Sequence, residues 1–132
     1  MRLKIIVFIF IIIISIGCDN PVEQSDENGP LVISFKNNTG FQLKNILVDN
    51  KPIGNLQSES STKYFAFDTF TFDTGMPDEN ASAEINEETF TNHSRGFWCG
   101  TEKITINSGK YLIEIAVVDT VLFLICRNAP RI

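Results

Sequence analysis

The chain contains few residues of the types that carry out acid–base or nucleophilic chemistry. Its one histidine, His93, lies in the polar, loop-like run Asn92–Arg95. Without a second histidine or a reactive free cysteine, the Ser–His and Cys–His schemes lack a distinguishing signature here. Adjacent carboxylates occur at Asp78–Glu79 and Glu87–Glu88. Neighbouring residues of a strand point to opposite faces, so a solvated turn explains both pairs better than a general acid–base couple. We therefore expect that the protein is not an enzyme.

Oxygen ligands for a cation gather between residues 68 and 80. They comprise four carboxylates and an amide, at Asp68, Asp73, Asp78, Glu79 and Asn80. Calcium loops place their ligands at fixed intervals, and this segment matches no such spacing. A solvated polar loop is the better explanation, so we expect no metal and no cofactor.

The three cysteines, Cys18, Cys99 and Cys126, are the residues most informative about compartment. The chain before Cys18 has the order of an export signal: basic Arg2 and Lys4, ten apolar residues from Ile5 to Ile14, then the small-residue segment Ser15–Gly17. Ten helical residues span about 15 Å, roughly half of a hydrocarbon core, which disfavours a spanning helix. We expect cleavage before Cys18.

The segment that ends at Cys18 resembles the lipobox read by the bacterial lipoprotein signal peptidase, although Ser15 stands where that family usually has Leu, Val or Ala. The resemblance implies that residues 1–17 are removed and that Cys18 becomes a lipidated N-terminus, held in the membrane by its acyl chains. An ordinary secretory signal is the alternative, but it leaves an odd thiol in an oxidising compartment. Lipidation leaves Cys99 and Cys126 to form a disulfide.

Charge limits the partners of the mature chain. Residues 1–17 contain two basic and no acidic side chains, so the rest carries nine basic and sixteen acidic ones, a net charge of about −7. Nucleic acid and anionic headgroups both demand clustered lysine and arginine, so we expect no nucleic-acid partner and a membrane contact made by acyl chains.

Residues 18–30 hold little apolar surface and predict a flexible acidic tether with a span of about 20 Å. Asp19 resembles signals that retain lipoproteins at the inner membrane, whereas acidic runs resemble surface-display signals. The chain therefore predicts the bacterial cell envelope, inner or outer membrane, periplasmic or surface-exposed.

From Leu31 onward the apolar residues alternate with a period of two, which predicts strands. The parity changes near Lys44–Asn45, which predicts a bulge, and again across Asp68–Thr69, which predicts a bulge or a crossing between sheets. Residues 104–118 predict a hairpin about Asn107–Gly109. Residues 31–132 are thus expected to form an antiparallel β-sandwich of the immunoglobulin-like or Greek-key type, with about seven to nine strands. A partly closed β-barrel is the alternative.

The predicted register and the redox argument disagree about a bridge between Cys99 and Cys126. Pairing about the two expected turns places Cys99 level with Val117 and Cys126 level with Ile113, about 13 Å apart along the strands, whereas disulfides need Cα atoms within about 7 Å. Glycines at Gly96 and Gly100 could let the chain leave the strand and fold back. We expect the bridge, with two buried thiols as the alternative.

Aromatic residues supply the candidate binding positions. Alternating aromatics from Tyr64 to Phe72 are what a sandwich core requires, although a ligand platform is the alternative. Phe97 and Trp98 lie between Gly96 and Gly100, where a tryptophan in a loop can anchor a partner. Trp98 covering the end of the core is the alternative.

The mature region resembles the small β-sandwich lipoproteins of bacterial envelopes. General features carry the likeness: residues 36–40 (KNNTG) after the first strand and residues 108–111 (SGKY) before a late one. The resemblance implies a lipid-anchored module that binds a protein or glycan partner, a class that includes immunity and inhibitor proteins. A structural or accessory subunit of an envelope complex is the alternative.

Overall fold

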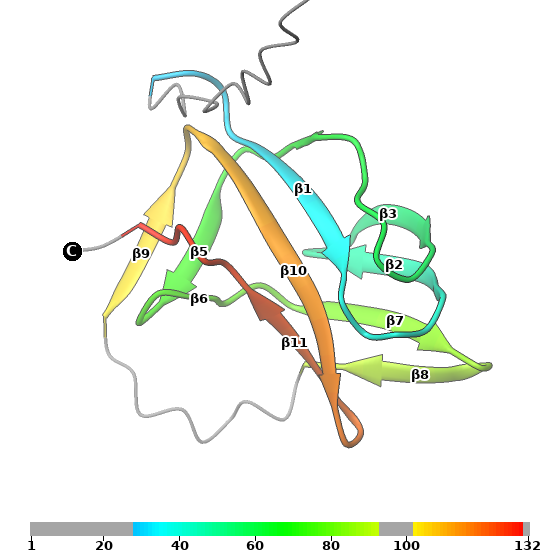
Figure 1. Cartoon of the computed structure of the whole chain (residues 1–132). Helices are drawn as coiled ribbons and strands as arrows, with labels where there is room; N and C mark the ends of the chain where they lie inside the picture. The colour runs from blue at the N-terminus through cyan, green and yellow to red at the C-terminus, as the bar shows by residue number, and fades with distance from the viewer. Residues whose placement is uncertain (1–27, 93–101, 131–132) are drawn as a thin grey trace, which may run out of the picture.

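The computed structural model describes residues 28–92 and 102–130. These residues form strands in two sheets and contain no helix, so no helix in this part of the chain could cross a membrane (Figure 1). The predicted all-β fold is confirmed. The strands are β1 (Val32–Asn37), β2 (Leu43–Val48), β3 (Lys51–Leu56), β4 (Phe65–Ala66), β5 (Phe70–Asp73), β6 (Met76–Pro77), β7 (Ala81–Ile85), β8 (Glu88–Thr91), β9 (Lys103–Ile106), β10 (Lys110–Val118) and β11 (Val121–Ile125).

The larger sheet has the strand order β3-β2-β7-β8-β11-β10-β1-β4 and is nearly closed, like a barrel. The chain after β3 helps to close it by returning to β1: the Asn37 amide donates to the Ser60 carbonyl at 2.9 Å, and the Thr62 amide to the Phe35 carbonyl at 2.8 Å. Most strand pairs are antiparallel, but β1 pairs with β10 and β8 with β11 in parallel. The closure is the feature that the barrel alternative anticipated.

The smaller sheet, β6-β5-β9, packs its phenylalanines against the larger one. The parity change at Asp68–Thr69 is a crossing between sheets, because β4 belongs to the larger sheet and β5 to the smaller. Phe67, Phe70 and Phe72 are buried, with neighbouring ring centroids 5.6 and 5.4 Å apart. The core therefore lies between the inner wall of the barrel-like sheet and β5.

The bulge predicted at Lys44–Asn45 is confirmed. The register of β2 against β3 shifts between Leu43 and Ile46, and Asn45 has a φ of 48°. The extra residue lets both Leu43 and Ile46 point into the core, where neither is more than 1% exposed. A bulge thus explains why the apolar pattern changes parity within one strand.

The hairpin predicted for residues 104–118 is wrong. β9 pairs with β5, and β10 lies between β1 and β11 (Figure 1). The amide of Val32 donates to the Gly109 carbonyl at 2.9 Å, so β1 occupies the edge of β10 that a hairpin partner would have used. The residues 107–109 connect two sheets instead of two paired strands.

Two further differences concern short strands. The polar stretch 75–80, expected to be a loop, contains β6, which pairs Phe72 with Pro77. β4 and β6 have two residues each, too few to show an alternating pattern. These short elements raise the number of strands in the described residues above the expected seven to nine.

Candidate interaction surface

The outer face of β10 and β11 is apolar, although it points away from the core. The register places side chains of both strands on this face in adjacent pairs: Ala116 opposite Phe123, and Val118 opposite Val121. Alternate residues of the same strands, such as Ile113 and Leu122, fill the core. We name this face the β10–β11 face; its apolar residues are Leu112, Ala116, Val118, Val121, Phe123 and Ile125.

Several of these apolar side chains are exposed to solvent. Val118 is 59% exposed, Leu112 38% and Ile125 37%. The outer face of an antiparallel sheet is normally polar when it faces water. From Leu112 to Val118 the face is about 20 Å long, and two strands are about 10 Å wide, so it covers about 200 Å². The largest apolar patches of monomeric proteins cover about 300 to 600 Å² and are often functional.

An ion pair lies within the β10–β11 face. Arg127 Nε donates to Glu114 Oε1 at 2.9 Å, and a second guanidinium nitrogen donates to Oε2 at 3.2 Å. Glu114 is nearly buried, whereas the side chain of Arg127 is 79% exposed. The hydrogen bonds from Arg127 outweigh desolvation and lower the pKa of Glu114, and they raise that of Arg127. The pair therefore stays charged at neutral pH and presents the guanidinium to solvent beside apolar residues.

Cys126 is a free, buried thiol in the structure, and no disulfide is seen in residues 28–92 and 102–130; its expected partner, Cys99, lies outside the described residues. The Cys126 Sγ lies 3.4 Å from Asn128 Oδ1. The pairing of Val118 with Val121 confirms the register that puts Cys126 level with Ile113. β9 pairs with β5 and not with β10, so the register that put Cys99 level with Val117 does not hold. Burial raises the pKa of the thiol to about 11, so the thiol is protonated at neutral pH and is a weak nucleophile.

Two grooves adjoin the segment after β11. One, of about 420 Å³, lies between the β5–β6 turn, the start of β9 and residues 126–130. The other, of about 580 Å³, lies between the end of β9, the start of β10 and residues 128–130. Cys126 lines the first groove, where its protonated thiol donates to Asn128 Oδ1.

The carboxylates considered as cation ligands are used within the fold. Asp78 accepts from Lys103 Nζ at 2.9 Å, and Glu79 Oε1 accepts from the Thr71 amide at 2.8 Å. Asp73 Oδ1 accepts from the Thr74 hydroxyl. Partial burial raises the pKa of Glu79. In residues 28–92 and 102–130, histidine, cysteine and carboxylate side chains form no group of three that could hold a metal ion.

Other predicted positions divide into three groups. The aromatic run is mostly core, as expected: Phe67, Phe70 and Phe72 are buried, but Tyr64 is 41% exposed. Glu87 and Glu88 lie at an exposed hairpin turn, in agreement with the prediction. The remaining candidates lie outside the described residues: Cys18, His93, Phe97, Trp98 and Cys99.

The β10–β11 face was not singled out as a site from the sequence, although one indication existed. Val121–Ile125 is apolar at every position, which a strand with one wet face does not require. The expected register already pairs Val118 with Val121, and the structure adds that Leu112, Val118 and Ile125 of this face are exposed. Comparison with protein-family models, with curated proteins and with solved structures finds no match to the chain.

Proposed function

We propose that the protein is a lipid-anchored component of the bacterial cell envelope whose β domain is an interaction module. The anchor is proposed from the sequence that ends at Cys18, and the partner surface is the β10–β11 face. The observation that carries the binding role is the exposed apolar row on that face, with Val118, Leu112 and Ile125 between 37% and 59% exposed.

The composition of the face favours a protein partner. Arg127, held by a nearly buried carboxylate, and Phe123 lie on this face, and arginine and aromatic residues are enriched at the centre of protein interfaces. A face of about 200 Å² is smaller than the half-interface of about 800 Å² in a standard complex. The β10–β11 face is therefore the centre of the interface, and the polar residues around it form the rim.

Charge favours a basic partner over a second copy of the chain. The residues after position 17 carry about seven more acidic than basic side chains. Glu88 and Asp119 lie near the end of the face, in the β8 strand and the β10–β11 turn. Two copies would repel each other, whereas a partner with a basic rim around an apolar centre would associate faster and in a defined orientation.

The decisive experiment combines capture with matched variants. The lipidated protein is cross-linked in intact envelopes, and the partners of the wild type are compared with those of Leu112→Glu and Leu47→Glu. Leu47 is the control because it is a strand leucine of similar exposure, 41% against 38%, on β2 instead of β10. A basic protein that Leu47→Glu retains and Leu112→Glu loses supports the proposal.

Three results would count against it. Loss of the partner in both variants would mean that general surface hydrophobicity causes capture, and retention in both would exclude the β10–β11 face. A Leu112-dependent homodimer in sedimentation would make a second copy the occupant. The anchor is tested separately by intact mass: loss of residues 1–17 with added acyl chains is expected, and Cys18→Ser should leave the membrane.

A further inference from the structure

The chain enters the β domain at one end of the barrel-like sheet and is fixed there. The Gly109 amide donates to the Gly29 carbonyl at 3.2 Å, and Pro30 and Ser108 form an isolated bridge. One residue later β10 begins alongside β1, with Lys110 opposite Val32. The segment that follows Cys18 therefore reaches the domain at a defined place, next to the start of β10.

Lysines and aromatic rings gather at this end. Lys110 Nζ lies 4.5 Å from the centroid of the Tyr64 ring, and Lys63 Nζ lies 5.5 Å from that of Phe65. Ala66, next to Phe65, pairs with Val32, which places this group beside the entry of the chain. We name Lys63, Tyr64, Phe65 and Lys110 the entry surface. Tyr64 is its exposed ring, at 41%.

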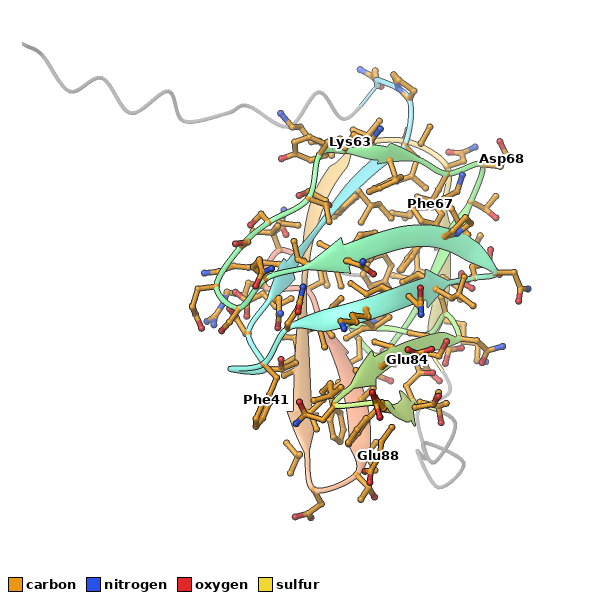
Figure 2. All side chains as sticks on the ribbon, turned by 90° about the vertical axis from the view of Figure 1, so that its right-hand side faces the viewer. Phe41, Lys63, Phe67, Asp68, Glu84 and Glu88 are labelled. Carbon is orange, nitrogen blue, oxygen red and sulfur yellow. The ribbon has the colours of Figure 1, made fainter. Side chains whose placement is uncertain are left out.

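Lysines gather at one end of the domain, where Asp68 also lies. Figure 2 shows Lys63 at the upper end, with Phe67 and Asp68 also there, whereas Glu84 and Glu88 lie in the lower half. Lys51 adds a third ammonium group near the upper end, 5.1 Å from the centroid of the Phe67 ring. The β10–β11 turn with Asp119 lies at the lower end (Figure 1). A protein that is acidic as a whole thus places lysines where its N-terminal segment enters.

We propose that the entry surface lies against the anionic headgroups of the membrane that anchors the protein. Tyrosine is favoured at the headgroup level because its ring is apolar and its hydroxyl is polar, and lysine stems can cover a ring while the ammonium reaches a phosphate. This inference rests on the proposed membrane anchor. The acyl chains hold the protein, and the entry surface sets the orientation of the domain.

The sequence predicts that the nine residues between Cys18 and Asn28 form a flexible tether. A coil of that length spans about 16 Å on average and can also collapse to less, so the domain could reach the surface. Each lysine close to an anionic surface favours the bound orientation by about fivefold. Lys63 and Lys110 together therefore favour it by about 25-fold, whereas Asp68 at the same end and the four acidic residues of the tether oppose it.

The experiment places one tryptophan at each of two positions of equal exposure. The full chain with Trp98→Phe receives either Tyr64→Trp or Leu47→Trp, since Tyr64 and Leu47 are both 41% exposed. Each protein is reconstituted in vesicles of brominated phosphatidylcholine and phosphatidylglycerol, and flotation confirms that it is attached. Bromine quenches tryptophan only at short range, so Tyr64→Trp should be quenched and Leu47→Trp should not.

Further arms identify the cause. Adding Lys63→Gln and Lys110→Gln, or omitting phosphatidylglycerol, should reduce quenching of Tyr64→Trp to the level of Leu47→Trp. Equal quenching at both positions in floating protein would overturn the proposal, as would quenching that is independent of the lysines and of the lipid charge.

Failure of the anchor would be recognised separately. If the full chain does not float, the proposed lipid anchor is wrong. The comparison is then repeated with residues 1–17 replaced by a histidine tag on a nickel-chelating lipid, which holds the same chain at the surface. Unequal quenching in that arm still supports the entry surface, and equal quenching rejects it.

Discussion

Replacement of Asn37 by aspartate should strongly destabilise the closed arrangement of the larger sheet. Asn37 is fully buried at the end of β1. Its Nδ2 donates to the carbonyls of Phe41 at 2.6 Å and Leu56 at 3.0 Å, and its Oδ1 accepts from the Thr39 amide and hydroxyl. One amide therefore joins β1, the loop after it and the end of β3.

Asn37→Asp keeps the shape and the acceptor but removes both donors. Two carbonyl groups, one of them fully buried, then lose their hydrogen bonds, at a cost of about 1 to 3 kcal/mol each. A buried carboxylate facing those carbonyls adds to the penalty. We expect a loss of about 3 kcal/mol or more in the free energy of unfolding, which for a domain of this size lowers the thermal midpoint by more than about 12 °C.

The assay is urea unfolding of the purified chain followed by circular dichroism, with Asn55→Asp as the matched control. Asn55 is exposed, and the oxygen that accepts from the Asn45 amide is retained in the aspartate. The control should change stability by less than about 0.5 kcal/mol. Because burial favours the protonated form of the new carboxyl, the defect of Asn37→Asp should shrink at acidic pH. Equal effects of the two variants, or a defect that grows on acidification, would refute the reasoning.

Three other outcomes are expected. Hydrogen bonds from Arg127 lower the pKa of Glu114 in the folded state. The stability that they contribute is therefore complete above the unfolded pKa of Glu114 and is lost as the pH falls through the folded pKa. In urea unfolding, Arg127→Ala should lower the free energy of unfolding at neutral pH and leave it unchanged at acidic pH. The Cys126 thiol should react with a disulfide reagent only when the protein unfolds, since it is buried with a pKa of about 11. If it reacts only after a reductant is added, and peptide mapping links Cys99 to Cys126, the two cysteines form the bridge instead. A chain starting at Gly29 should unfold cooperatively with a β-type spectrum, and substantial helix would contradict the fold.

Local patterns predicted the strands well because burial on one face requires alternation. Leu31, Ile33 and Phe35 are all buried, as their spacing predicts. The bulge at Lys44–Asn45 was equally visible, since one extra residue reverses the parity of every following side chain. Each of these features depends on residues a few positions apart.

Strand pairing was predicted only in part: the pairing of Val118 with Val121 is confirmed, but the pairing of β9 with β10 is wrong. The run Asn107–Gly109 suits a hairpin turn, and the flanking segments suit strands, yet β1 takes the place beside β10. That choice depends on the whole sheet, because β1 and β10 bury Phe35 and Ile113 against the same core. The entry surface could not be predicted from the sequence for the same reason. Lys110 and Tyr64 are 46 positions apart, and only the folded sheet brings them together.

The two proposed surfaces place constraints on each other. β10 starts at the entry surface with Lys110 and ends at Val118, and eight residue steps of about 3.3 Å carry the chain about 26 Å along the strand. If the entry surface lies on the membrane, the exposed end of the β10–β11 face stands away from the headgroups by up to that distance. A partner can then reach Val118 without contacting lipid. An entry surface bound to the partner instead would bring the acidic lower end toward anionic headgroups, which charge repulsion disfavours. Lys110 and Val118 are therefore expected to act at opposite ends of one strand, whereas Leu112 lies only about 7 Å along the strand from the entry surface.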